Sequence, residues 1–201
     1  MSGDVGSGKS TLAAYLAGLI PAVSGSVRRT GITSSMVSFQ FPEYHITGAT
    51  LAGECESWGL DPGKILREVG MEAKADTDPL KLSRGELKRL HLACVLQKPY
   101  DLLVLDEPFS SLDCGEKQRI CAALTRQCHG ITIIFTHEQS IFPATDRIWD
   151  LRCGRLHDIG PLPGALSRWP AAPPLIQRLV AEGKLPKNIS PEDLLEAACR
   201  T

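Results

Sequence analysis

The sequence contains no long hydrophobic run. Its longest apolar stretches, such as residues 102–105 and 131–135, are far shorter than the roughly 20 apolar residues that a membrane-spanning helix needs. No charged and then apolar leader stands at the start, so we expect no secretory signal and a cytoplasmic protein. Any contact with a membrane would then depend on a partner.

The chain also lacks an excess of charge of either sign. Its 22 Lys and Arg residues and 23 Asp and Glu residues give a formal net charge of -1, whereas nucleic-acid-binding domains usually concentrate basic residues on one face. This balance argues against a DNA or RNA partner. With 201 residues, 43% of them hydrophobic, the chain is long enough for one sizeable core and a small subdomain.

The seven cysteines include no C-x-x-C pair, so that zinc-binding and thiol-redox motif is absent. We expect buried free thiols instead. Cys114, Cys121 and Cys128 recur every seven residues and could share a helix face. Because free cysteine behaves as a small buried hydrophobe, packing is favoured over a metal site for these three.

A glycine-rich loop stands at the start of the chain. Gly3, Gly8, Lys9 and Ser10 satisfy the spacing G-x-x-x-x-G-K-S. Glycines let backbone N–H groups wrap phosphates, while the lysine neutralises the outer phosphates and the serine ligates magnesium. The loop therefore predicts binding of a nucleoside triphosphate with magnesium. The alternative is a glycine-rich turn that merely precedes a helix.

The pattern along the chain predicts an α/β fold with a parallel sheet. Apolar residues at helical spacing predict a helix over residues 9–20, which Pro21 ends. Three short apolar runs have the pattern of buried parallel strands: residues 36–39, 102–105 and 131–135.

The rest of the chain is organised differently. Between residues 44 and 80, glycine, proline and charged residues surround short helical patterns, which suits a small helical insertion. Further on, the sequence predicts a hairpin, an irregular connector and a final helix with Ser190 as its cap. These elements cover residues 147–159, residues 161–174 and the chain from Ser190 onward.

Two acids end the second predicted strand. Asp106 can hold a magnesium shell and Glu107 can polarise water. Acids that simply cap a strand end are the alternative interpretation. In a chain that also carries the phosphate loop, the pair indicates hydrolysis rather than binding alone.

A helix start precedes this strand. Ser83 and Glu86 have the spacing of an ordinary capping box. A serine-capped start that contains Gly85 also presents free N–H donors and the positive end of the helix dipole to a phosphate. Both interpretations can hold at once.

Three further residues complete an ordered set. Gln40 follows the first strand, Asp113 follows Glu107 closely, and His137 follows the third strand. A lone residue of these types is normally a solvated or satisfied polar side chain. The order and spacing of the whole set, however, resemble those of the ABC-type ATPases.

The resemblance implies a P-loop NTPase parallel-sheet core with a small α-helical subdomain, lacking the N-terminal strands of the family. An ABC-type nucleotide-binding domain would cover residues 1–160, with the helical subdomain at about 44–98, and a C-terminal linker and helical extension would cover 161–201. The Walker A loop would comprise Gly3, Asp4, Val5, Gly6, Ser7, Gly8, Lys9, Ser10 and Thr11. The other motifs would be the Q-loop at Gln40, the signature at 82–86, Walker B at 102–107, the D-loop at 111–113 and the switch histidine, His137.

The resemblance also implies roles. ATP and Mg²⁺ would be the cofactors, with Ser10, Gln40 and Asp106 at the metal. Glu107 would act as general base or water orienter, His137 would contact the terminal phosphate, and Gln40 would report to a transmembrane partner. A second ATPase subunit, identical or not, would contribute Ser83, Gly85 and Asp113 to the nucleotide site.

Within the family, residues 37–43 look like the Q-loop of energy-coupling factor transporter ATPases, and residues 173–186 are similar to their C-terminal extension. This implies a peripheral protein on the cytoplasmic face of the membrane that powers uptake of a vitamin, cobalt or nickel. Its partners would be a transmembrane coupling protein and a substrate-binding membrane component, with no nucleic acid. The alternatives are a soluble ABC-type ATPase acting on nucleic acid or ribosomes, and an inactive truncated fragment.

Two departures from the family pattern stand out. Arg84 and Glu86 replace a glycine and a glutamine of the usual L-S-G-G-Q signature. In addition, only two residues precede the phosphate loop, where the family has a strand and an adenine-stacking aromatic residue. We therefore expect the 201-residue chain alone to be unstable or to bind ATP poorly, and about thirty upstream residues, if encoded, to rescue it.

Overall fold

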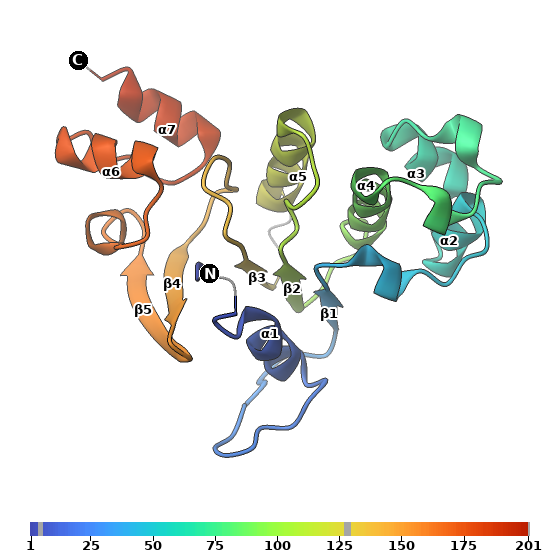
Figure 1. Ribbon diagram of the computed structural model, residues 1–201, viewed down its shortest axis with the longest axis horizontal. Coiled ribbons are helices and arrows are strands. Elements are labelled where there is room, and N and C mark those ends of the chain that lie inside the picture. Colours follow the sequence, from blue (N-terminus) through green and yellow to red (C-terminus); the bar gives the residue numbers. More distant parts are fainter. Residues whose placement is uncertain (4–5, 127–129, 201) are drawn as a thin grey trace.

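The structure, a computed structural model, describes residues 1–3, 6–126 and 130–200. It has a mixed α/β architecture, as expected (Figure 1). The α-helices are α1 (Lys9–Ala17), α2 (Leu51–Ser57), α3 (Pro62–Glu68), α4 (Arg84–Val95), α5 (Cys114–Arg126), α6 (Pro174–Ala181) and α7 (Pro191–Ala198). The strands are β1 (Ser35–Ser38), β2 (Leu102–Asp106), β3 (Ile131–Phe135), β4 (Arg147–Arg152) and β5 (Arg155–Pro161). Short 3₁₀ turns lie at η1 (Pro42–His45), η2 (Glu72–Lys74), η3 (Pro79–Lys81) and η4 (Leu166–Arg168).

The core sheet is parallel, in the order β1-β2-β3. All five residues of the central strand β2 are buried. Because successive side chains of a strand point to opposite faces, Val104 packs with Ala13 of α1, whereas Leu103 and Leu105 pack with residues of α4 and α5. The parallel sheet thus has helices on both faces (Figure 1), which explains why its strands read as continuous apolar runs.

Residues 1 and 2 lie between β3 and β4. On one side, the Thr136 amide donates to the Met1 carbonyl at 3.1 Å. On the other side, the Ser2 amide donates to the Trp149 carbonyl, and the Leu151 amide donates to the Ser2 carbonyl, both at 2.9 Å. The segment before the phosphate loop therefore makes strand-like bonds in both directions and connects the β4-β5 hairpin to the parallel sheet.

The predicted helical insertion consists of short helices around a core of its own. Buried residues of α2, α3 and α4 form this cluster, which includes Leu51, Cys55, Ile65, Leu66, Leu90 and Cys94. The buried Glu54 carboxylate accepts hydrogen bonds from the Thr47 and Gly48 amides and from the Trp58 indole, at 2.7–2.8 Å. This carboxylate fixes the loop before α2. The proposed boundaries of this subdomain, at about 44 and 98, stay a prediction.

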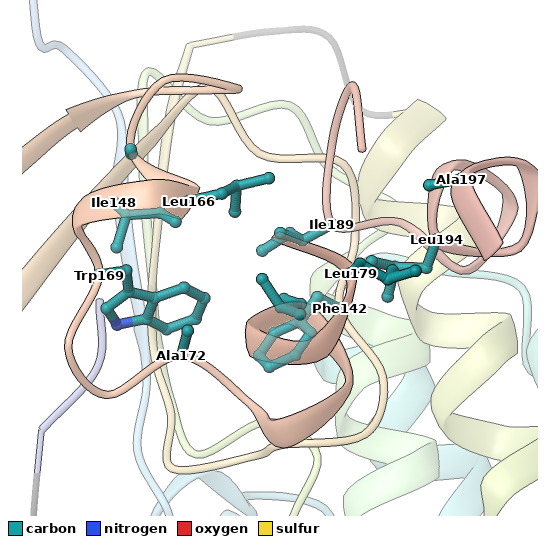
Figure 2. Packing of buried hydrophobic residues seen from close by; sticks show 11 residues of the cluster. Phe142, Ile148, Leu166, Trp169, Ala172, Leu179, Ile189, Leu194 and Ala197 are labelled. Carbon is teal, nitrogen blue, oxygen red and sulfur yellow. The ribbon is translucent and has the colours of Figure 1, made fainter. Parts of the chain in front are cut away.

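A second core fills the C-terminal part. Figure 2 shows Phe142, Ile148, Leu166, Trp169, Leu179, Ile189 and Leu194 gathered between the hairpin, the connector and the last two helices. The predicted hairpin is confirmed, and the connector is irregular apart from η4. Ser190 caps α7 by accepting from the Asp193 amide, as expected. The indole of Trp169 reaches out of this core and donates to the Ser2 hydroxyl at 3.2 Å.

Two expectations were wrong. The first helix ends at Ala17 instead of Ile20, because Gly18 adopts a left-handed conformation (φ 77°) and caps it. The prediction of buried thiols holds for Cys55, Cys94 and Cys121. It fails for the other described cysteines, Cys114, Cys153 and Cys199, which are exposed; Cys128 lies outside the described residues.

Within the described residues, no helix has the length and apolar character needed to cross a membrane.

Candidate functional site: a phosphate loop beside two strand-end acids

The phosphate loop opens directly into α1. Gly6 and Gly8 have φ angles of 79° and 96°, which non-glycine residues rarely adopt. Among the described residues, other than the chain neighbours, a Cβ atom at either position would meet no atom within 4 Å. Ser10 and Thr11 are exposed at the helix start, which has N–H donors for an anion. Asp4 and Val5, predicted members of this loop, lie outside the described residues.

Lys9 is buried, with 8% of its side chain exposed. Its ammonium group donates to the Gly3 carbonyl at 2.7 Å and lies 3.8 Å from a carboxylate oxygen of Glu107. The lysine thus spans the phosphate loop and the acid after β2. This contact confirms that the two sequence-predicted elements lie at one place.

Ser10 and Asp106 meet as well. The Ser10 hydroxyl donates to Oδ2 of Asp106. The other carboxylate oxygen, Oδ1, is buried and lacks a hydrogen-bond partner among the described residues, and burial raises the pKa of this carboxyl above its usual range. A buried oxygen without a donor beside a serine hydroxyl fits a hard cation, since Mg²⁺ takes oxygen ligands and usually only one or two carboxylates.

Glu107 follows Asp106 in a left-handed conformation (φ 50°). Its amide donates to the Phe135 carbonyl, and this bond extends the pairing of β2 with β3. Its carboxylate lies 2.8 Å from Nδ1 of His137 and accepts from the His137 amide at 3.3 Å. The glutamate is 8% exposed, but the histidine side chain is 58% exposed. The structure therefore brings together the predicted base and the predicted switch histidine, with the histidine facing solvent.

The signature residues lie against the D-loop. Ser83 caps α4: its hydroxyl oxygen accepts from the Glu86 amide at 3.3 Å and the Glu86 carboxylate accepts from the Ser83 amide at 3.0 Å, so the predicted capping box is confirmed. An ion pair with Lys74, followed by the bonds from Ser83, holds the pKa of Glu86 at about 2. A Cβ atom on Gly85 would lie 2.6 Å from the Ser111 carbonyl, so only glycine allows this approach.

Asp113 begins α5. Its carboxylate accepts from the Glu116 amide at 2.8 Å, and Glu116 in turn accepts from the Asp113 amide. The described contacts of Asp113 are thus those of a helix cap. Its predicted role at the nucleotide of a second subunit stays a prediction.

Gln40 follows β1 and contributes its backbone to the site. Its carbonyl accepts a hydrogen bond from the buried Lys88 of α4 at 2.5 Å. Gln40 also lines a small pocket together with Phe41, Glu43, Arg84, Lys88 and Ser111. The Q-loop, the signature and the D-loop therefore meet at one pocket, while the role of Gln40 as a metal ligand stays a prediction.

The sequence analysis did not predict a role for Lys88, His91 or His45. Lys88 and His91 are each only 1% exposed. The His91 ring stacks on the His45 ring, with ring centroids 4.6 Å apart. The Ser38 hydroxyl lies 3.0 Å from Nε2 of His91. The local sequence gave little signal for Lys88 and His91, because polar residues in a helix are normally exposed to solvent.

The burial of His91 should make stability depend on pH. Burial, followed by the nearby His45 and Lys88, lowers the pKa of His91 from 6.5 to about 3. Between these values the unfolded chain binds the extra proton, so the free energy of unfolding should fall as pH drops below about 6.5. His91 alone should remove about 2 kcal/mol between pH 7 and pH 5.

Urea unfolding at the two pH values measures this slope. His91→Gln, which keeps a partner for Ser38, should flatten it, whereas His157→Gln on an exposed part of β5 should not. Equal slopes for the wild type and His91→Gln would contradict the assignment.

Together these contacts define a phosphate-loop nucleotide-binding protein: the loop, both acids and the histidine all lie at the carboxyl end of the sheet, where α/β proteins bind ligands. The ABC transporter family profile matches residues 1–110, more than half of the chain. The chain belongs to the ABC transporter family.

Three relatives indicate the range of this similarity. The energy-coupling factor transporter ATP-binding protein EcfA1 of Lacticaseibacillus paracasei is 32% identical over 184 residues, 79% of this chain and 66% of the relative. The aliphatic sulfonates import ATP-binding protein SsuB 2 of Frankia alni is 37% identical over 166 residues, which cover 78% of this chain and 66% of the relative. The zinc transport system ATP-binding protein TroB of Treponema pallidum is 33% identical over 172 residues, which cover 73% of this chain and 64% of the relative. The chain thus spans just under two thirds of the length of these relatives.

Proposed function

We propose that the chain is an ATP-binding and ATP-hydrolysing subunit that powers a membrane importer. The observation that carries this proposal is the convergence of Lys9, Ser10, Asp106, Glu107 and His137 beside the phosphate loop. Lys9 and the loop amides would hold the phosphates. Glu107, held by His137, would accept a proton from the attacking water or orient that water.

Ser10 and Asp106 would hold a magnesium ion through the serine hydroxyl and the unpartnered Oδ1 atom. When bound, the metal neutralises phosphate charge. Gln40 is a further candidate ligand. Phosphate release from ATP tests the proposal, measured on the purified chain alone and on the chain extended by any encoded upstream residues, and it should stop when EDTA removes magnesium; no release above background from either form would refute it.

The second part of the proposal is a composite site. Ser83 and Gly85 are at the start of α4, where backbone N–H groups favour an anion. We propose that a second ATPase subunit presents these two residues, with Asp113, to the nucleotide on the first. Arg84 is exposed beside them, and its positive charge would favour a phosphate.

The third part is the membrane partner. We propose an importer of the energy-coupling factor type for a vitamin, cobalt or nickel, which the EcfA1 similarity supports, while the sulfonate and zinc relatives leave other solutes open. Phe41 and Tyr44 follow Gln40 and are 43% and 75% exposed. Their rings pack edge to face, 6.0 Å apart. Exposed aromatic pairs of this kind suit a protein interface.

The double variant Phe41→Ala/Tyr44→Ala should lower recovery of the transmembrane partner about tenfold, because aromatic anchors dominate interface energies. The measurement is co-purification from detergent extracts after co-expression with a transmembrane coupling protein of the energy-coupling factor type. Leu175→Ala/Leu195→Ala removes exposed apolar side chains from α6 and α7 and is the matched control. Equal recovery with both double variants would contradict an interface at the Q-loop.

A further inference from the structure

We propose that Lys88 is a positioning residue that fixes the Q-loop and the catalytic glutamate to the signature helix. The inference rests on the proposed ATPase function. Lys88 lies in α4, and no motif of the family pattern described above includes it.

The geometry joins three segments at one ammonium group. Nζ of Lys88 donates to the Gln40 carbonyl at 2.5 Å and to the Glu107 carbonyl at 3.4 Å. The first carbonyl belongs to the loop after β1 and the second to the loop after β2. The Ser110 hydroxyl also donates to the Glu107 carbonyl, at 2.9 Å. Gln40 and Glu107 are therefore both tied to the helix that begins with Ser83.

The surroundings explain why this lysine holds its place. Burying an ammonium group is costly unless it is hydrogen-bonded and opposed by negative charge. Burial lowers the pKa of Lys88 to about 8, and the carboxylates of Asp106, Glu43 and Glu107 oppose this shift. Since Oε2 of Glu43 is buried without a hydrogen-bond partner among the described residues, this carboxylate adds charge to the site of Lys88.

This geometry couples the motions of the two loops to each other. A lysine that bonds two loop carbonyls from one helix turn makes the two loops move with α4. If the Q-loop shifts when a partner binds, Glu107 cannot keep its place unless Lys88 releases one of the carbonyls. Lys88 bonds backbone carbonyls and acts on hydrolysis through the position of Glu107, so its loss should affect kcat more than KM.

The test compares Lys88→Met, which removes the donor, with Lys88→Arg, which keeps charge and donors. Lys88→Met should lower kcat about tenfold or more, as misplaced catalytic groups do, with KM changed less than about twofold. Lys88→Arg should restore most of kcat.

Hydrogen exchange of residues 39–46 and 107–111 should speed up in Lys88→Met only. Lys81→Met, at an exposed lysine of η3, is the control and should match the wild type.

Each outcome is decisive. Wild-type kcat and exchange in Lys88→Met would overturn the inference, and so would a kcat loss that Lys88→Arg does not restore. If Lys88→Met does not fold, Lys88→Gln takes its place, and unfolding of both would assign Lys88 to the fold alone. A wild type that hydrolyses no ATP would refute the proposed function, while exchange would still test the link between the loops.

Discussion

Glu107→Gln is expected to lower ATP hydrolysis by a factor of about 100 or more, the usual contribution of a positioned acid-base group. The carboxylate lies 2.8 Å from Nδ1 of His137 and 3.8 Å from the Lys9 ammonium group. Glutamine keeps the size of the side chain but cannot accept a proton from water. ATP binding should persist, so the loss of hydrolysis should appear as a lower kcat.

The same variant tests the composite site. If hydrolysis is blocked but binding is intact, ATP and magnesium should convert Glu107→Gln to a dimer on size-exclusion chromatography. Glu138→Gln, an acid nearby that pairs with Lys117 instead, is the control and should retain hydrolysis. A Glu107→Gln protein that stays monomeric with ATP would show that the site does not close through Ser83 and Gly85.

Lys9→Met should weaken ATP binding about 10- to 150-fold, because a hydrogen bond to a charged group contributes about 1.5–3 kcal/mol. The ammonium group already points along the loop toward the Gly3 carbonyl, in the place where phosphates would be held. Titration with a fluorescent ATP analogue measures the Kd. Lys64→Met, on an exposed position of α3, serves as control.

Removing Lys9 also takes a positive charge from Glu107. The melting temperature without nucleotide should therefore be recorded for Lys9→Met and Lys64→Met, to separate a folding defect from a binding defect. A Lys9→Met protein that is folded and binds ATP with wild-type affinity would refute the assignment of this loop.

The fold could be anticipated because its core strands contain apolar runs of strand length, although only β2 is buried throughout and the first residues of β1 and β3 are exposed. β3 has the predicted bounds of 131–135, β2 extends one residue beyond its predicted end, and β1 begins and ends one residue earlier than predicted. The first helix was predicted too long because apolar spacing continues to Leu19, although Gly18 has already turned the chain and left Leu19 58% exposed. Spacing reports which residues could face a core, but not where a left-handed glycine ends the helix.

The site was predictable where a residue type has few other uses. The G-K-S sequence and the two acids at the end of β2 predicted a phosphate loop and candidate magnesium ligands, and the structure places Ser10 against Asp106. Lys88 escaped prediction because lysine is normally solvated, and its burial depends on carbonyls that follow two different strands. Such a contact arises from tertiary packing between segments far apart in sequence, which no local pattern encodes.

The bond from Trp169 to Ser2 has an optical consequence. The indole is 7% exposed within the C-terminal core, yet its N–H group touches the hydroxyl of the residue next to Gly3. Indole emission responds to the hydrogen bonding and polarity around the ring. We therefore expect the intrinsic fluorescence of Trp169 to change when the phosphate loop is occupied, which an unlabelled nucleotide titration would measure.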